Sequence, residues 1–263
     1  MIDHELIKRA LAEDLQGGED ITSVATVSGS EKVVADFVAR KSGVIAGIDM
    51  ARAVLVELGL KDISVLVQDG VRVEAGAVLL TVRGDTRAIL LAERTALNFL
   101  GHLSGIATLT RRWVDEVAGT QCAIRDTRKT TPGMRQLEKY AVRMGGGTNH
   151  RMSLSDAALI KDNHIAAAGG VVAAFSQVRA KFPSAPIEIE VDTLEQLKEV
   201  LPLKPDLVLL DNMSPQQCAE AVAIAAGSCK LEASGGITLE NAKSYALSGV
   251  DYLAIGALTH SAP

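Results

Sequence analysis

Residues 187–211 read IEIEVDTLEQLKEVLPLKPDLVLLD, and this stretch decides the fold. Residues 187–191 alternate apolar and acidic side chains, and residues 207–210 are wholly aliphatic, as expected of two buried strands. The residues between them, 194–201, have the apolar spacing of a helix. A strand, a helix and a second strand in this order predict a parallel βαβ unit.

The same alternation continues through the second half of the chain. The expected strands are residues 123–125, 157–160, 187–191, 207–210, 230–233 and 252–255. A seventh strand is expected near residues 148–152. These units are too few for a complete eight-stranded barrel, so either an incomplete α/β barrel or an open doubly wound sheet is left. Of the two, we favour the incomplete barrel.

The N-terminal part has a different pattern, in which helices and strands are mixed. A long helix is expected from residue 85 to residue 116, broken near Gly101 and Gly105. We therefore expect an N-terminal domain over residues 1–105 and a catalytic barrel domain over residues 106–263. The other elements expected in the N-terminal domain are helices at residues 1–15 and 48–58 and strands at 32–40, 63–67 and 77–82.

Composition argues against several classes of protein. The net charge of -5 argues against non-specific binding to nucleic acids or membranes. No apolar run reaches the roughly 18 residues that a membrane-spanning helix needs, and the N-terminus lacks the layout of a signal peptide. The 3 cysteines form no CxxC pair, which fits a reducing compartment. We expect a cytoplasmic protein.

Positive charge is concentrated between residues 125 and 151. This stretch contains many lysines and arginines but only two acids, Asp126 and Glu138, so we expect it to contribute to an anion-binding site. We interpret three of the basic residues, Arg135, Lys139 and Arg143, as the solvated face of a helix.

Charged residues or glycines follow every expected strand of the second half. In α/β barrels the active site lies at the carboxyl ends of the strands and is built by several of them. We therefore expect these residues to converge on one site. They are residues 126–129, 161–164, 190–192, 211–212, 234–236 and 256–257.

Two kinds of anion site are indicated among these residues. Residues 234–238 present free backbone N–H groups at the start of a helix, which favours a phosphate, with Gly256 and Ala257 as a second wall. A plain turn is the alternative for this glycine pair. The candidates for binding carboxylates are Arg128, Lys129, Arg151 and Lys161.

The acidic residues Glu190 and Asp211 end neighbouring strands. They could bind ribose hydroxyls, hold a divalent metal through water or stabilise a cationic centre. Ion pairing with the basic cluster is the structural alternative. The histidines have no metal-ligand spacing; we expect His150 to hydrogen-bond a substrate and His164 to be a structural loop residue.

Together these motifs resemble the quinolinate phosphoribosyltransferase family, and the resemblance covers nearly the whole chain. It implies a pentosyl glycosyltransferase of pyridine nucleotide biosynthesis. Such an enzyme converts quinolinate and phosphoribosyl pyrophosphate to nicotinate mononucleotide, pyrophosphate and carbon dioxide in de novo NAD synthesis. Paralogues associated with molybdenum transport share the fold, but the RKTTPG and NHR stretches resemble the enzyme. The most specific motifs are residues 125–133, 139–143, 145–151 and 159–164.

The resemblance also implies an architecture and site roles. The fold would be an N-terminal α/β sandwich with an incomplete, seven-stranded α/β barrel, in a homodimer with shared active sites, and Arg94 would reach the partner's site. Mg²⁺ would be bound with the substrate's pyrophosphate and not by a protein metal site. Catalysis would fall to Lys129, Lys161, Glu190 and Asp211. The implied substrate-binding residues are Arg128, Lys129, His150, Arg151 and Lys161 for quinolinate, Glu190 and Asp211 for ribose, and Ser234, Gly235, Gly236, Gly256 and Ala257 for the 5-phosphate. Thr127 is a further expected substrate-binding residue.

Family members usually continue past the motif at residues 257–261 with a tail that returns to the N-terminal domain, whereas this sequence stops at Pro263. We expect this difference to affect packing of the sandwich and no matched site residue.

An alternative of another class is a biotinyl or lipoyl carrier, whose turn-and-strand pattern residues 69–80 resemble. The lysine that such a carrier needs is absent from that hairpin.

Overall fold

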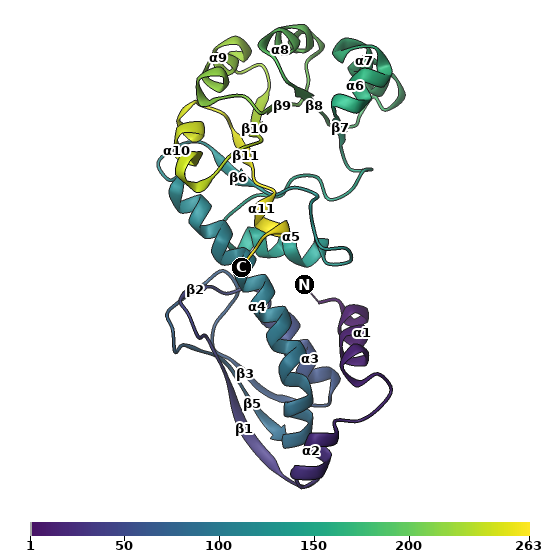
Figure 1. Ribbon diagram of the computed structural model, residues 1–263, viewed down its shortest axis with the longest axis vertical. Coiled ribbons are helices and arrows are strands. Elements are labelled where there is room, and N and C mark those ends of the chain that lie inside the picture. The colour runs from purple at the N-terminus through teal and green to yellow at the C-terminus, as the bar shows by residue number, and fades with distance from the viewer. Residues whose placement is uncertain (1) are drawn as a thin grey trace. The chain divides into compact units, whose positions relative to one another are not determined.

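The computed structural model describes residues 2–263 (Figure 1). The chain forms two compact units that interleave in sequence. The first comprises residues 1–111, 136–146 and 262–263, and the second comprises residues 112–135 and 147–261. The expected domain boundary between residues 105 and 106 stays a prediction.

The first unit contains a three-stranded antiparallel sheet in the order β1-β5-β3 and a two-stranded sheet of β2 and β4. The Asp20 carboxylate accepts the N–H groups of Thr22 and Ser23 and begins a short helix. The elements are α1 (His4–Leu15), α2 (Ile21–Thr26), β1 (Lys32–Val38), β2 (Gly43–Val44), α3 (Ile48–Glu57), β3 (Asp62–Val65), β4 (Arg72–Val73) and β5 (Val78–Asp85).

Helix α4 (Thr86–Glu116) is continuous, so the expected break near Gly101 and Gly105 is wrong. Gly101 has open space around it, whereas Ser104 and Gly105 make close contacts, and none of them interrupts the helix. Ser104 Oγ exchanges hydrogen bonds of 3.1 Å with the backbone of Ala46, and a Cβ on Gly105 would clash with the carbonyl oxygen of Pro263. Glycine in a helix interior is unfavourable in isolation, but here close packing against that carbonyl requires it.

The second unit is an incomplete α/β barrel. All six expected strands are confirmed, and they form one parallel sheet in the order β6-β11-β10-β9-β8-β7. Figure 1 shows the strands curving around a common interior, with helices outside them. The strands are β6 (Ala123–Arg125), β7 (Ala158–Ile160), β8 (Ile187–Val191), β9 (Leu207–Asp211), β10 (Lys230–Ser234) and β11 (Tyr252–Ala254).

The expected seventh strand is wrong as a strand, because only a single bridge joins Thr148 to Arg125. The chain leaves the ladder at the next residues, where the side chain of Asp126 replaces a neighbouring strand as hydrogen-bond partner. Its Oδ1 accepts the backbone N–H of His150 at 2.7 Å, and its Oδ2 accepts the side-chain amide of Asn149. The seventh position of the barrel is therefore an irregular segment that carries a functional candidate, His150.

Short, capped connections link several strands to the helices that follow. Thr193, Ser214 and Thr238 cap α8, α9 and α10, and each helix begins within a few residues of a strand end. This arrangement keeps the strand ends together on one side of the sheet. No helix in the described part of the chain has the length and apolar character needed to cross a membrane. The helices are α5 (Arg135–Met144), α6 (Asp162–Ala168), α7 (Val171–Lys181), α8 (Leu194–Val200), α9 (Pro215–Ala225), α10 (Leu239–Leu247) and α11 (Ala257–His260), with a 3₁₀ turn at Leu201–Leu203.

Candidate active site

A cavity of about 710 Å³ opens at the carboxyl ends of the parallel strands. The structure brings together most of the site residues predicted from the second half of the chain. Glu232, which was not predicted as a site residue, also lines the cavity. The predicted residues that line the cavity are Thr127, Arg128, Lys129, His150, Arg151, Lys161, Glu190, Asp211, Ser234, Gly235, Gly236, Gly256 and Ala257.

One side of the cavity is basic. Arg128 and Arg151 are half-buried, and the Nε atom of Arg128 is buried without a hydrogen-bond partner in the described chain. Nη1 of Arg151 donates to the carbonyl of Ala157 at 2.8 Å, which fixes the guanidinium. Burial, and then the positive charge of Arg128, lower the pKa of Arg151. Because Arg128 and Arg151 repel each other, they favour an anionic ligand between them.

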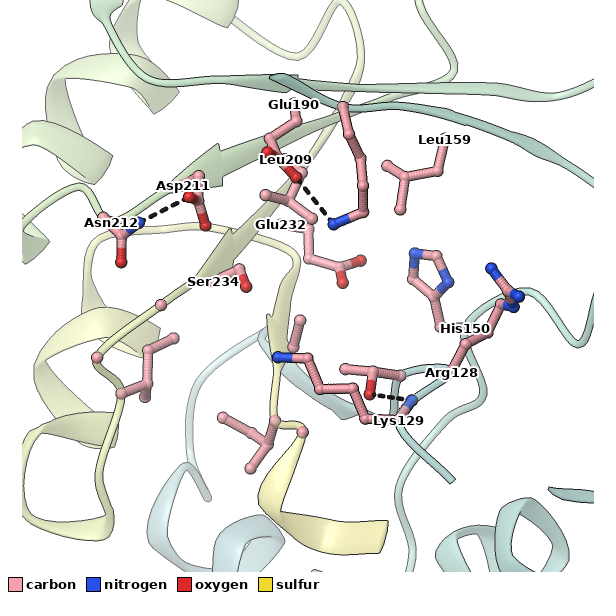
Figure 2. Close-up of a pocket in the computed structure, with 18 of the residues that line it drawn as sticks. Arg128, Lys129, His150, Leu159, Glu190, Leu209, Asp211, Asn212, Glu232 and Ser234 are labelled. Atoms are coloured by element: carbon pink, nitrogen blue, oxygen red, sulfur yellow. Dashed lines mark hydrogen bonds and ion pairs between the residues drawn. The ribbon is translucent and has the colours of Figure 1, made fainter. Parts of the chain in front are cut away.

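The opposite side is acidic, and Figure 2 shows Asp211, Asn212 and Ser234 there, across the cavity from His150 and Arg128. Nζ of Lys161 lies 3.3 Å from Oε2 of Glu190, so the ion pairing considered as an alternative role is present. Burial raises the pKa of Glu190, and Lys161 opposes the shift.

Asp211 has a similar environment, in which burial and then the charge of Asp192 raise its pKa. Asn212 donates to its Oδ2 at 2.6 Å, which holds the carboxylate in place. Two carboxylates whose ionised forms are disfavoured gain most from a cationic ligand, because that ligand offsets the cost of their charge. The acidic side is therefore suited to a positively charged or hydroxyl-rich group.

The glycine-rich loop after β10 has the geometry of an anion site. Gly235 and Gly236 have φ angles of 86° and 61°, and a Cβ on Gly235 would clash with the side-chain oxygen of Asn212. The loop leads into α10, whose N-cap is Thr238, so backbone N–H groups are available at a helix start. The structure thus favours the anion-site interpretation of this loop over a plain turn.

The expected solvated helix face is wrong for Lys139. Lys139 and Glu138 of α5 are fully buried, and Nε2 of His102 lies 2.9 Å from Oε1 of Glu138. Arg135 has a structural role, since its guanidinium donates hydrogen bonds to the hydroxyl of Thr130 and to the carbonyl of Met152. The sequence interpretation failed because it assigned charged residues to the surface, whereas this helix buries charge with compensating partners.

Some residues expected at the site lie outside the cavity lining, namely Asp126, Asn163, His164, Val191, Asp192 and Arg94. His164 accepts the backbone N–H of Lys161 through Nδ1 at 3.0 Å, which supports the structural role expected for it, at the start of α6 and not in a loop. Arg94 lies on α4 in the first unit with an exposed side chain. Its predicted role in a partner's site stays a prediction.

The sequence reasoning missed a buried charged group that includes Arg125, Glu188 and Glu232. Nη1 of Arg125 lies 2.6 Å from Oε2 of Glu232, and Nε2 of His150 lies 2.6 Å from Oε2 of Glu188. A signal was present in the sequence, because side chains two positions apart on a strand share a face. Glu188 precedes Glu190 by two residues, so both had to point into the barrel.

Three members of this group have the spacing of a metal site, since ligand atoms of His150, Glu188 and Glu232 all lie within 4.8 Å of one another. The guanidinium of Arg125, however, already occupies one oxygen of Glu232. A fixed positive charge at that distance opposes a second cation. The group is therefore better suited to holding a proton than a divalent ion.

Comparison with known proteins gives a consistent result over the whole chain. Residues 20–104 match the family model of the quinolinate phosphoribosyl transferase N-terminal domain, and residues 106–263 match that of the C-terminal domain. The nicotinate-nucleotide pyrophosphorylase [carboxylating] of Mycobacterium leprae (strain TN) is 55% identical over 263 residues, which cover 98% of this chain and 93% of that protein.

Two further relatives agree. The quinolinate phosphoribosyltransferase [decarboxylating] 2b, mitochondrial, of Nicotiana tabacum is 40% identical over 278 residues, covering 98% of this chain and 78% of that protein. The crystal structure of NadC from Streptococcus pyogenes superposes with a TM-score of 0.95 at 39% identity, covering 98% of this chain and 92% of that one.

Proposed function

This chain belongs to the quinolinate phosphoribosyltransferase family, and from that membership we propose how its cavity carries out the reaction. The enzyme converts quinolinate and phosphoribosyl pyrophosphate to nicotinate mononucleotide, pyrophosphate and carbon dioxide in de novo NAD biosynthesis. The observation that carries the assignment to this cavity is the arrangement of its walls. A basic side, an acidic side and a glycine-rich anion loop surround one space of about 710 Å³.

The basic side is assigned to quinolinate. Its two carboxylates need several donors, and guanidinium groups bind carboxylates in a planar fork while ammonium groups act as point charges. The lowered pKa of Arg151 supports this assignment, because a dianion between Arg128 and Arg151 removes their mutual repulsion. The residues assigned to quinolinate are Thr127, Arg128, Lys129, His150, Arg151 and Lys161.

The acidic side and the glycine-rich loop are assigned to phosphoribosyl pyrophosphate. Glu190 and Asp211 face the ribose, and the loop binds the 5-phosphate through Ser234, Gly235 and Gly236, with Gly256 and Ala257 as the second wall. The raised pKa of both carboxylates supports a cationic partner in the reaction. When the pyridine nitrogen attacks the anomeric carbon and pyrophosphate leaves, positive charge develops on the sugar, and these carboxylates stabilise it.

Mg²⁺ belongs to this reaction as an ion carried by the substrate. A hard cation prefers oxygen ligands and keeps several waters, so the pyrophosphate oxygens can hold it, and the carboxylate of Asp211 can accept hydrogen bonds from its water shell. When bound, it neutralises charge on the departing pyrophosphate. The protein's own contribution is to orient both substrates and to exclude water from the reacting atoms.

Loss of carbon dioxide follows from the first step. Attachment of the ribose makes the ring a pyridinium, which stabilises the electron pair left at the neighbouring carbon when the C2 carboxylate departs. The remaining carboxylate stays bound to the basic side, so the ring does not turn during this step. The last requirement is one proton at that carbon.

We also propose a cytoplasmic homodimer in which Arg94 completes the partner's site. Support comes from the position of Arg94, whose exposed guanidinium has no ion-pair partner within residues 2–263. An exposed arginine on a rigid helix is available to a carboxylate supplied by another molecule.

The assignment is tested by mixing purified protein with quinolinate, phosphoribosyl pyrophosphate and Mg²⁺. Equal amounts of pyrophosphate, carbon dioxide and nicotinate mononucleotide are expected. A matched Asp211→Asn variant should lose product formation while keeping its fold. Products that appear without carbon dioxide, or only when nicotinate replaces quinolinate, would contradict the assignment.

A further inference from the structure

Four polar side chains form one layer in the interior of the barrel. Arg125, Glu232 and Glu188 come from β6, β10 and β8, which occupy alternate places in the sheet order β6-β11-β10-β9-β8-β7. His150 comes from the segment that bridges to β6 at Thr148. Barrel interiors are filled by layers to which alternate strands contribute, and such layers are usually aliphatic. We call these four side chains the polar layer.

The polar layer is largely shielded from solvent, with Arg125 as its most exposed side chain at 18%, and it is joined by short contacts. Arg125 contacts Glu232, and His150 contacts Glu188, both at 2.6 Å. The exposed fractions of the His150, Glu188 and Glu232 side chains are 6%, 7% and 0%. Figure 2 shows the carboxyl group of Glu232 and the ring of His150 turned toward each other at the cavity. The layer therefore lies against the basic side of the cavity, where quinolinate is assigned.

Two carboxylate oxygens of the layer lack a hydrogen-bond donor. Oε1 of Glu188 and Oε1 of Glu232 are buried without a partner among the described residues. A buried, ionised oxygen in this condition is costly, and a proton on one of the two carboxyl groups turns it into a donor. These two oxygens therefore provide a site for one added proton, because no donor in the layer already binds them.

Charge balance leads to the same conclusion. Two carboxylates and one guanidinium give a net charge of -1 when His150 is neutral, and one added proton brings the layer to zero. Burial, and then the charge of Glu188, raise the pKa of Glu232 well above its usual range in spite of Arg125. The other charged groups facing the layer are Asp126, which binds the backbone of His150, and the arginines of the basic side, which the substrate's carboxylates balance.

We propose that Glu188 and Glu232 store one proton and that His150 passes it to the ring carbon from which carbon dioxide leaves. This inference rests on the proposed function. The bond between C2 and its carboxylate breaks, carbon dioxide departs, and the electron pair remains at C2. This electron pair at C2 takes a proton from one ring nitrogen of His150. The other ring nitrogen, Nε2, which lies 2.6 Å from Oε2 of Glu188, takes up the stored proton. Water reprotonates the carboxyl pair after the product leaves.

His150 is the catalytic residue of this step, because it lines the cavity and its ring gives the proton to the substrate. Glu188 and Glu232 act through it as positioning residues. Either Glu188→Gln or Glu232→Gln leaves one carboxylate and one guanidinium, a neutral layer that has no need of a stored proton. Each single variant should therefore affect formation of nicotinate mononucleotide and spare release of pyrophosphate. Exposed Glu195 of α8 provides the matched control, Glu195→Gln.

The experiment is a single-turnover rapid quench that follows pyrophosphate and nicotinate mononucleotide separately. For Glu232→Gln we expect pyrophosphate release within about twofold of wild type and product formation about 100-fold slower, the usual contribution of a general acid. Glu188→Gln should behave alike, Glu232→Asp should recover part of the lost rate, and Glu195→Gln should match wild type. If both rates fall equally in a folded variant, or neither falls, the proton-storage role is wrong.

Wild-type enzyme provides a second measurement that does not depend on the folding of a variant. In deuterium oxide, product formation should slow while pyrophosphate release does not, and no isotope effect on product formation would overturn the proposal. Failure of the proposed function looks different, because wild-type enzyme would then release neither pyrophosphate nor carbon dioxide from these substrates.

Discussion

The side-chain oxygen of Asn212 occupies the space that a Cβ at position 235 would need, so only glycine fits there. The backbone N–H of Asn212 also donates to the carbonyl of Ser234 at 2.9 Å, so the ends of β9 and β10 are held together where the glycine-rich loop begins. The loop conformation and the position of Asn212 are therefore interdependent.

Gly235→Ala should weaken use of phosphoribosyl pyrophosphate. The substitution adds a clash with Asn212 to the strain of a φ of 86°, at a cost on the order of 1–3 kcal/mol. We expect a higher KM for phosphoribosyl pyrophosphate and little change for quinolinate in steady-state kinetics. Gly236→Ala is the matched control, because its Cβ would meet open space and only the strain remains. Equal effects of the two substitutions would exclude the steric explanation.

The second carboxylate of quinolinate should decide substrate choice. Several cations converge on the basic side, where nicotinate would leave at least one of them without its partner. Losing a buried charge-assisted contact costs about 2–5 kcal/mol, so kcat/KM for nicotinate should be at least about thirtyfold lower. Competition assays with both acids measure this ratio. Comparable use of the two would remove the assignment of the basic side.

The stability of the protein should depend on pH through Glu232. Its pKa is raised in the folded state by burial and by Glu188, so its contribution to stability is fully present below the usual pKa of glutamate. That contribution is lost as the pH rises through the raised folded value. The free energy of unfolding of Glu232→Gln should therefore improve relative to wild type as the pH rises. A difference between the two proteins that stays constant with pH would contradict the burial of an ionisable group here.

Removal of divalent metal should abolish activity reversibly. We expect chelated and dialysed enzyme to regain full activity when Mg²⁺ is added together with phosphoribosyl pyrophosphate, because the ion arrives on the substrate. Metal analysis of the dialysed protein provides the check. A stoichiometric ion that survives chelation would point instead to a metal site built by the protein.

Arg94→Ala and Lys161→Ala should each nearly abolish activity while leaving the fold and the dimer intact. If Arg94 serves the partner's site, a mixed dimer contains one site with its own Lys161 and the partner's Arg94. Mixing the two inactive proteins should then restore activity, measured as product formed per mixed dimer. Mixed dimers that form and remain inactive would place Arg94 in its own subunit's site.

Much of the barrel was predictable because its signals are local. Aliphatic strands and short capped turns fix which residues follow each strand, and so the sequence alone located Glu190, Asp211 and the glycine-rich loop. What it missed lies deeper. Lys139 was assigned to solvent because lysine is usually exposed, whereas its side chain is fully buried here. Glu188 and Glu232 were overlooked because attention went to strand ends, although their spacing already placed them on the inward face.

The expected helix break and the expected seventh strand were wrong for a different reason. Gly105 was expected to interrupt a helix, yet the helix continues through it. Glycine is required at this position because a Cβ would clash with the carbonyl oxygen of Pro263, a contact that the intrinsic preference of glycine does not reveal. The expected seventh strand was replaced by a single bridge because the Asp126 side chain, which sequence patterning does not register, takes over the backbone hydrogen bond of His150.

The polar layer serves the reaction at a cost in the stability of the fold. Buried ion pairs are often less stabilising than well-packed apolar side chains of the same volume, by about 1–4 kcal/mol. A laboratory selection for heat resistance alone would therefore tend to replace Arg125 and Glu232 with residues such as methionine and leucine. Such a barrel would be more robust and chemically idle, so thermostabilising this enzyme calls for screening on product and not on solubility or melting temperature.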